Sequence, residues 1–316
     1  MEQPVLSFFL NVYDDTSDHM PELSLDISPL SPAFSLQRTA LHLVVDAVVN
    51  LASETAAGAV ELLRTQQLHP KRKSDGSWIT DADMLAHRIL TERLPGILNL
   101  PVISEERVPD FSQRKDWSSF WLIDPIDNTE GLVRGVPAHS SVSIALIVHG
   151  APQISVIAYL TDGRSMRAYG DTVEARSDLQ SWSTLPCGNP TNPLRFVAYK
   201  PSARLMTEEM RQLFDRLSVQ DSQLVEGDRL YQRFTALLNN TADVYLEPRR
   251  FPAWDVAPCI CGLLAQGASV LSLRTGTALN YNSATMLADP FIIGRRGVDT
   301  HALVQQAGML STPLSA

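Results

Sequence analysis

The densest group of reactive side chains lies in residues 121–135, whose sequence is WLIDPIDNTEGLVRG. An apolar run, typical of a buried strand, leads into Asp124 and Asp127 on either side of a proline. Pro125 has a fixed φ and no backbone N–H, so it ends a strand ladder and begins a rigid turn. We therefore expect both carboxylates to point into one pocket, where Mg²⁺ would offset their mutual repulsion.

The residues after Asp127 add groups that suit a phosphate. Asn128 and Thr129 precede a predicted helix, and free N–H groups at a helix start bind anions. The Thr129 hydroxyl would stand beside a water molecule at the same turn. The pattern also fits a solvated Asx-type turn with a capping threonine, and the motif alone leaves both interpretations open.

Three other stretches favour the metal site: KSDGSWITDAD at 73–83, PVISEE at 101–106 and AWDVAP at 253–258. Together with the central motif, their order and spacing resemble the Mg²⁺-dependent, Li⁺-sensitive phosphatases of the inositol monophosphatase superfamily. Within it, the chain resembles the bacterial CysQ-type 3′(2′),5′-bisphosphate nucleotidase branch, through PVISEE, FWLIDP at 120–125, SIALI at 143–147 and GTALNY at 276–281. The resemblance covers residues 36–294.

The resemblance implies a role for each polar residue of these motifs. Two or three Mg²⁺ ions would be held by Glu105, Asp124, the carbonyl of Ile126, Asp127 and Asp255. The catalytic residues would be Thr129, Asp83 and Glu105, with Thr129 and Asp83 orienting and deprotonating the attacking water. The substrate would be bound by Asn128, Thr129, Arg233 and Lys73.

Without the resemblance, several of these residues have ordinary explanations. Asp83 would be a favourable charge at a helix start, and Asp255 an N-cap residue. Lys73 belongs either to a solvated loop or to a positive edge that attracts an anion. Arg233 stands where nucleotidase relatives have a lysine; it would either pair with a second phosphate or lie on an exposed helix face.

The chain departs from the family pattern at four places, one of which is the missing Gly-Ser before the substrate helix, where Glu226-Gly227-Asp228 stands nearby. Asn128 replaces the glycine of Asp-Gly-Thr, and asparagine is the best replacement if that position needs a positive φ. Glu130 and Gly131 replace a pair that usually contains a lysine. Pro258 follows Asp255 closely; if Asp255 is the N-cap, Pro258 is the third helical residue and needs no intrahelical N–H.

Hydrophobic periodicity predicts an α/β protein, and the resemblance implies an α+β layered sandwich of the order α-β-α-β-α. In the N-terminal half we expect two helices, at 36–65 and 81–94, and an antiparallel sheet with strands at 142–148, 154–159 and 164–169. In the C-terminal half we expect helices at 207–217, 228–239 and 257–266, and a mostly parallel sheet with strands at 195–199, 242–246 and 268–273. We expect an extension at 1–35 that is loosely structured by composition, an α+β domain with the main metal motif at 36–190, and an α/β domain closing the site at 191–316.

Composition limits the classes of partner and compartment. A net charge of −9 over 316 residues argues against binding of a nucleic-acid polymer. The apolar run at 5–10 is too short to span a membrane, and the three cysteines fit a reducing compartment, so we expect a cytoplasmic protein. Cys259 and Cys261 lie in an apolar run and are expected to pack rather than bind metal. A homodimer is left open.

Three functional hypotheses follow. The first is an Mg²⁺-dependent phosphomonoesterase acting on a small phosphorylated substrate, 3′-phosphoadenosine 5′-phosphate or a related nucleotide. The second is an inositol-monophosphatase-like phosphatase of another small alcohol or sugar phosphate. The third is a catalytically weak homologue that binds a phosphorylated ligand.

Overall fold

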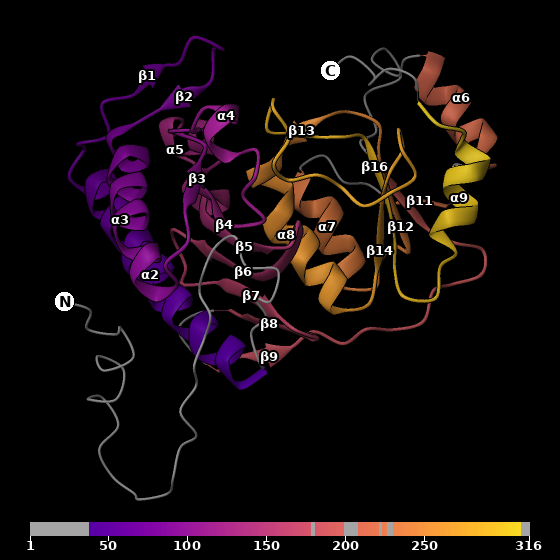
Figure 1. Ribbon diagram of the computed structural model, residues 1–316, viewed down its shortest axis with the longest axis horizontal. Helices are drawn as coiled ribbons and strands as arrows, with labels where there is room; N and C mark the ends of the chain where they lie inside the picture. The colour runs from indigo at the N-terminus through magenta and orange to yellow at the C-terminus, as the bar shows by residue number, and fades with distance from the viewer. Residues whose placement is uncertain (1–37, 178–180, 199–207, 221–222, 226–229, 311–316) are drawn as a thin grey trace, which may run out of the picture.

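The described elements stack in five alternating layers of helices and sheets (Figure 1). The computed structural model describes residues 38–177, 181–198, 208–220, 223–225 and 230–310. The expected extension at 1–35 lies outside these ranges. The predicted α-β-α-β-α sandwich is confirmed.

A seven-stranded sheet carries the N-terminal half. Its strands lie in sequence order, and only the β3/β4 pair is parallel. They are β3 (Val102–Ser104), β4 (Ser119–Asp127), β5 (Ser141–Val148), β6 (Ala151–Tyr159), β7 (Ser165–Tyr169), β8 (Thr172–Arg176) and β9 (Ser183–Thr184). Along β4, Phe120 and Leu122 face one core cluster, whereas Trp121 and Ile123 face the other. Both faces of the central strands are therefore covered, which explains their nearly unbroken apolar sequence.

Two helices, α2 (Arg38–Arg64) and α3 (Asp81–Ile97), form the outer layer on one face of this sheet. They pack against each other, and α2 contacts β5, β6 and β7. Within the described residues, Leu41–Arg64 is long and apolar enough to cross a membrane. Most of its apolar side chains pack in the core cluster between α2, α3 and the sheet, as in the core helix of a globular protein. A short hairpin of β1 (Lys71–Arg72) and β2 (Trp78–Ile79) connects the two helices.

The second sheet has the order β11-β10-β12-β16-β14 and is mixed rather than mostly parallel. Its strands are β10 (Phe196–Ala198), β11 (Leu224–Val225), β12 (Val244–Glu247), β14 (Ser269–Ser272) and β16 (Phe291–Gly294). The pairs of β10 with β11 and β12 are parallel, but β16 is antiparallel to both β12 and β14. The expected β12–helix–β14 crossover is present; the late strand β16 inserts between its two strands and makes the sheet mixed.

The layer between the two sheets consists of α7 (Leu230–Leu238) and α8 (Ala253–Ala265). Helix α8 contacts β4 to β8 on one side and β14 on the other. Cys259 and Cys261 are buried there as free thiols, so their predicted role in packing is confirmed. Helices α6 (Glu208–Arg216) and α9 (Thr300–Ala307) cover the outer face of the second sheet. The small elements are α4 (Phe111–Arg114), α5 (Thr129–Val133), the 3₁₀ turn Pro137–His139, β13 (Phe251–Pro252) and β15 (Leu287–Ala288).

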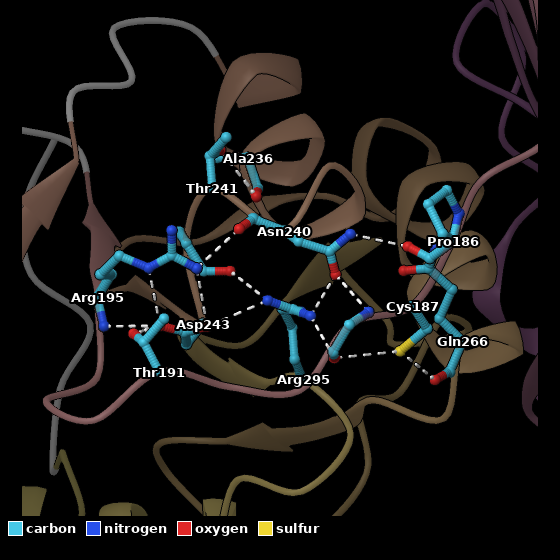
Figure 2. A network of polar contacts seen from close by, with 12 residues as sticks. Pro186, Cys187, Thr191, Arg195, Ala236, Asn240, Thr241, Asp243, Gln266 and Arg295 are labelled. Atoms are coloured by element: carbon cyan, nitrogen blue, oxygen red, sulfur yellow. Dashed lines mark hydrogen bonds and ion pairs between the residues drawn. The ribbon is translucent and has the colours of Figure 1, made fainter.

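A buried polar network fastens the segment that leads from the first sheet to the second (Figure 2). Asp243 is fully buried and accepts hydrogen bonds from the Thr191 hydroxyl at 2.6 Å and from Arg295 Nη1 at 3.1 Å. The backbone N–H of Arg195 donates to the same carboxylate at 2.9 Å, and Asn240 Nδ2 donates to the Pro186 carbonyl at 2.8 Å. The network thus anchors 186–195, where we placed the domain boundary. Because α8 packs on both sheets, the division at residue 190 stays a prediction.

Candidate active site

An irregularity in β4 brings Asp124 and Asp127 to the same side of the sheet. Three residues apart in a regular strand, they would face opposite sides. The pairing of β4 with β5 shifts register between them, at Pro125. Accordingly, Ile126 packs in the same core cluster as Ile123. The alternation is therefore reset across the turn, and the two carboxylates point to one side, as the sequence predicted.

Glu105 is placed beside these two aspartates by the parallel pairing of β3 with β4. The pairing ends with Ser104 opposite Ile123, and the Glu105 N–H donates to the Ile123 carbonyl at 3.1 Å. Its side chain accepts a hydrogen bond from Lys73 Nζ at 2.8 Å, and the same ammonium donates to Glu106 at 2.8 Å. Glu106 is not exposed: its side chain has 3% of its surface accessible. Lys73 thus lies at the site as predicted, but in this structure its charge is directed to carboxylates.

Asp255 reaches the site from the other half of the molecule. It lies in the first turn of α8, whose N-cap is Pro252, so the expectation that Asp255 is the N-cap is wrong. The helix begins at Ala253, because the preceding Pro252 holds an extended backbone (φ −52°, ψ 139°) from which the helix starts. Pro258 therefore lies one turn deeper than expected, where it removes an intrahelical hydrogen bond.

A cavity of about 570 Å³ joins these groups. Six carboxylates and two cationic side chains line it: Asp75, Glu105, Asp124, Asp127, Glu130 and Asp255, with Arg72 and Lys73. Asp255 and the Asp124/Asp127 pair share this space although 128 positions separate Asp127 from Asp255. A cavity with this excess of negative charge would repel a phosphate unless cations bound first.

Without such cations, burial and mutual repulsion raise the pKa values of the carboxyl groups. Burial, followed by the charges of Glu105, Asp127 and Asp255, raises the pKa of Asp124 well above its ordinary value. Burial and the Glu105 charge raise the pKa of Asp127 to about 6, against a backbone hydrogen bond from Asn128 that lowers it. Burial, followed by the charges of Asp127 and Glu105, raises the pKa of Asp255 well above its ordinary value. Burial also raises the pKa of Glu106 to about 7, although Lys73 opposes the shift.

The donor set fits Mg²⁺. Every donor offered by the four expected ligand side chains is a carboxylate oxygen, the type that Mg²⁺ prefers. Asp124 Oδ1 is buried and has no hydrogen-bond partner among the described residues, which is costly for an acceptor unless something binds it. Within the described ranges, no three Asp, Glu, His or Cys side chains are arranged to hold a metal ion as they stand. Lys73 supplies positive charge at Glu105, one of the expected ligands.

A contact between α3 and the turn after β4 joins Asp83 to Thr129, the two residues expected to act on the attacking water. Thr129 Oγ1 donates to Asp83 Oδ1 at 2.8 Å and lies 3.0 Å from the Ile126 carbonyl oxygen. The other carboxylate oxygen of Asp83 accepts from the N–H and hydroxyl of Thr80, at 2.7 and 2.6 Å, in a capping box. Asp83 is therefore both the predicted helix-start charge and a buried partner of Thr129. Burial raises its pKa, while the hydrogen bonds from Thr80 and Thr129 oppose that rise.

Asn128 adopts the left-handed conformation that the sequence predicted, with φ 62° and ψ 48°. Its carboxamide lies over the start of α5: a Cβ added at Gly131 would stand 3.0 Å from Asn128 Cγ and closer still to Nδ2. That nitrogen is buried and has no hydrogen-bond partner among the described residues. The two departures from the family motif are thus spatially linked, because glycine at 131 makes room for asparagine at 128.

Arg233 does not line the cavity, and the structure corrects its expected contact with substrate. It is 2% exposed in the core of the C-terminal half, where Nε donates to the Tyr245 hydroxyl at 3.1 Å. Its Nη2 lies 3.6 Å from Glu247, which is fully buried. The charged partner in the interior, rather than an incoming phosphate, accounts for the position of this arginine.

Two cavity residues had weak signals in the sequence. Arg72 stands just before the KSDGSWITDAD motif, and Trp78 stands inside it without a role implied by the resemblance. Both line the cavity from the β1–β2 hairpin. An arginine and a tryptophan six residues apart around a Ser-Asp-Gly turn are a hairpin pairing signal that could have placed them opposite each other.

Comparison with known proteins gives a consistent result. The 3′(2′),5′-bisphosphate nucleotidase CysQ of Haemophilus influenzae is 28% identical over 255 residues, which cover 76% of this chain and 89% of that protein. The crystal structure of CysQ from Bacteroides thetaiotaomicron, described as a bacterial member of the inositol monophosphatase family, matches with a TM-score of 0.61 and 21% identity over 83% of this chain and 99% of that one. A crystal structure of an IMPase/NADP phosphatase complexed with Mg²⁺ and phosphate matches with a TM-score of 0.63 and 14% identity over 85% of this chain and 96% of that one.

The two structural matches show that the fold is shared. The model of the inositol monophosphatase family matches residues 41–308, a span that includes every site residue discussed above. The protein therefore belongs to the inositol monophosphatase family of phosphatases.

Proposed function

We propose that the protein is an Mg²⁺-dependent 3′(2′),5′-bisphosphate nucleotidase that releases phosphate from 3′-phosphoadenosine 5′-phosphate or a related nucleotide. The observation that carries the proposal is the contact of Thr129 with Asp83, directly beside a cavity that collects carboxylates from the first sheet and from helix α8. The similarity to CysQ nucleotidases over most of the chain supports the choice of substrate class. We infer a cytoplasmic location from the three free cysteines and from the same relatives.

The chain's own residues would perform the following steps. Glu105, Asp124, Asp127, Asp255 and the Ile126 carbonyl would hold two or three Mg²⁺ ions, which acidify water and neutralise phosphate and leaving-group oxygens. The Thr129 hydroxyl donates a hydrogen bond to Asp83. Its oxygen lone pairs are therefore left to accept a hydrogen bond from the attacking water. As the water attacks phosphorus in line and the bond from phosphorus to the ester oxygen breaks, the water proton passes to Thr129 and the hydroxyl proton of Thr129 passes to Asp83. The ester oxygen takes a proton from solvent and leaves as the alcohol.

The remaining residues bind and orient the substrate. The Thr129 N–H lies at the start of α5 and is a donor for phosphate oxygens. The Asn128 N–H is shared with the Asp127 carboxylate, which lowers the pKa of that acid, so we assign it the weaker part in phosphate binding. Lys73 would contact a phosphate only after its ammonium leaves Glu105 and Glu106.

The test measures phosphate release from 3′-phosphoadenosine 5′-phosphate, 3′-AMP and inositol 1-phosphate, with Mg²⁺, with EDTA and with added Li⁺. We expect Mg²⁺-dependent turnover, the highest kcat/KM on the bisphosphate and inhibition by Li⁺.

Asp124→Asn should reduce kcat at least about 10³-fold, which is equivalent to several kcal/mol of activation barrier. Asp75→Asn is the matched control, because Asp75 lines the same cavity from the hairpin; it should stay within a few-fold of wild type. Normal turnover by Asp124→Asn would refute the assignment.

The second candidate is a phosphatase of another small alcohol or sugar phosphate. The burial of Arg233 favours it, because the residue expected to bind the second phosphate of a nucleotide is directed into the core. A higher kcat/KM on inositol 1-phosphate than on 3′-phosphoadenosine 5′-phosphate in the same assay would select this alternative.

A further inference from the structure

The cavity contains a cationic side chain that the proposed mechanism does not use. Arg72 lines the cavity, and its side chain is exposed. Lys73, the other cation of the lining, is bonded to Glu105 and Glu106. Among the described residues, Arg72 makes no ion pair that the structure records. Of the two described cations that line the cavity, Arg72 is therefore the one whose positive charge is available to a ligand.

The guanidinium of Arg72 is held in place by two contacts within the hairpin. Arg72 and Trp78 are directly opposite each other in the β1/β2 pairing, and the guanidinium carbon lies 3.7 Å from the centre of the indole ring. Nη1 also donates to the Gly76 carbonyl. Stacking on an aromatic face leaves the in-plane N–H groups of arginine free to point outward. An arginine fixed in this way can bind a phosphate through two parallel hydrogen bonds.

The position of the hairpin separates Arg72 from the site of chemistry while keeping both in one cavity. Lys73, which follows β1, contacts Glu105 of the expected metal site. Arg72 lies within β1 and stacks on Trp78 of β2, so the two side chains have different partners in the cavity. A substrate whose reacting phosphate lies at the carboxylates would reach Arg72 with a different group.

We propose that Arg72, positioned by Trp78, binds the second, non-reacting phosphate of a doubly phosphorylated substrate. The inference rests on the proposed phosphatase function and takes the place of the contact that Arg233 does not make. It makes Arg72 a specificity-determining residue and Trp78 a positioning residue. The anion held by Arg72 contributes to substrate binding, so the effect of removing the guanidinium falls on KM and leaves kcat largely unchanged.

The experiment compares singly and doubly phosphorylated forms of the same alcohol in two pairs: 3′-AMP with 3′-phosphoadenosine 5′-phosphate, and inositol 1-phosphate with inositol 1,4-bisphosphate. Wild type should prefer the doubly phosphorylated member of the pair it hydrolyses by at least about 10-fold in kcat/KM. Arg72→Gln should lose about 10- to 100-fold on that member through KM, and change by less than about two-fold on the singly phosphorylated one. Arg72→Lys should recover part of the loss, since it restores charge without the planar fork.

Variants at Trp78 test the positioning role. Trp78→Leu should raise KM for the doubly phosphorylated substrate by about 2- to 5-fold, whereas Trp78→Phe, which keeps an aromatic face, should stay close to wild type. Trp78→Leu should have no effect when combined with Arg72→Gln, because the stacked group is then gone. A Trp78→Leu effect that persists in the Arg72→Gln background would overturn the positioning role.

Each outcome separates the inference from the proposed function. Equal losses on both members of a pair, or no loss, overturn the role of Arg72 and leave the phosphatase assignment in place. A preference for inositol 1,4-bisphosphate that disappears in Arg72→Gln supports the inference and overturns the nucleotide as substrate. Absence of turnover on all four compounds overturns both.

Discussion

The pair formed by Thr129 and Asp83 gives the sharpest test of the mechanism. Thr129→Val keeps the shape of the side chain and removes the hydroxyl that bonds Asp83 Oδ1 at 2.8 Å. If proton transfer passes through this pair, kcat should fall by about 10²- to 10⁴-fold, the range for positioned acid–base groups. Thr129→Ser retains the hydroxyl and should keep most of the activity.

The structure also fixes the expected cost in stability. Asp83 is 1% exposed. Its Oδ1 accepts a hydrogen bond from Thr129, and its Oδ2 accepts hydrogen bonds from Thr80. Thr129→Val leaves a buried oxygen without that donor, which should lower the free energy of unfolding by about 1–3 kcal/mol. Thr80→Ala is the control: it loses the helix cap for about 1 kcal/mol but leaves the Thr129 contact. It should therefore cost similar stability with a much smaller loss of kcat.

A double-mutant cycle with Asp83→Asn decides whether the two residues act as a unit. In Asp83→Asn, the amide nitrogen can face Thr129 and donate to it, which reverses the direction of the hydrogen bond and removes the proton acceptor. Groups that act together give a double variant no slower than the slower single variant. The measurements are steady-state phosphate release with saturating Mg²⁺ and urea unfolding followed by circular dichroism. If the two losses in kcat multiply in the double variant, the relay through Thr129 to Asp83 is wrong.

Three further predictions follow from other parts of the structure. Asp243→Ala should lower the free energy of unfolding by about 3–5 kcal/mol because Arg295 is left buried without its partner, whereas Arg134→Ala, which breaks an exposed pair with Glu130, should change it by less than about 1 kcal/mol in the same urea titration. Gly131→Ala should destabilise the protein by about 1–3 kcal/mol and reduce kcat/KM, because the new methyl overlaps the Asn128 carboxamide; Asn128→Gly in the same chain should relieve both defects, and persistence of either would contradict the overlap. Mg²⁺ at 100 times its Kd should stabilise the wild type by about 2.7 kcal/mol per ion bound, with most of that stabilisation absent in Asp124→Asn; equal Mg²⁺ stabilisation of the two proteins in calorimetry would count against the carboxylate site.

The parts of the site that are built from residues close in sequence could be predicted. The other parts depend on contacts between distant segments, which the spacing of residues does not specify. Asp124 and Asp127 were predicted to share a pocket from Pro125 alone, and the register shift confirms that reading. The meeting of Asp83 with Thr129, 46 positions apart, followed only from family resemblance. Nothing in the local pattern of 81–94 states that its first turn lies against the end of a strand at 119–127.

The misplacement of Arg233 was avoidable in part. Leu230, Phe234 and Leu237 mark the buried face of α7, and Arg233 lies on that same face by helical spacing. A charged residue on a buried face needs a partner, which Glu247 supplies from β12. The mixed second sheet was not readable in the same way, because nothing in the local sequence of β16 (Phe291–Gly294) specifies that it pairs between β12 and β14.

In the unusual motif Asp-Asn-Thr, the asparagine at 128 is compensated by the glycine at 131. The position after Asp127 needs a left-handed backbone, which asparagine adopts at low cost. Its carboxamide then requires space that only a glycine at 131 leaves. The backbone at 128 is thus kept in the conformation that directs Thr129 toward Asp83, and the carbonyl of Asn128 still accepts the N–H of Gly131 at 3.0 Å and the Ser140 hydroxyl at 3.0 Å. A change that looks like loss of a family residue therefore preserves the contact of Thr129 with Asp83 on which the proposed proton transfer depends, and it adds the Asn128 side chain to the lining of the cavity.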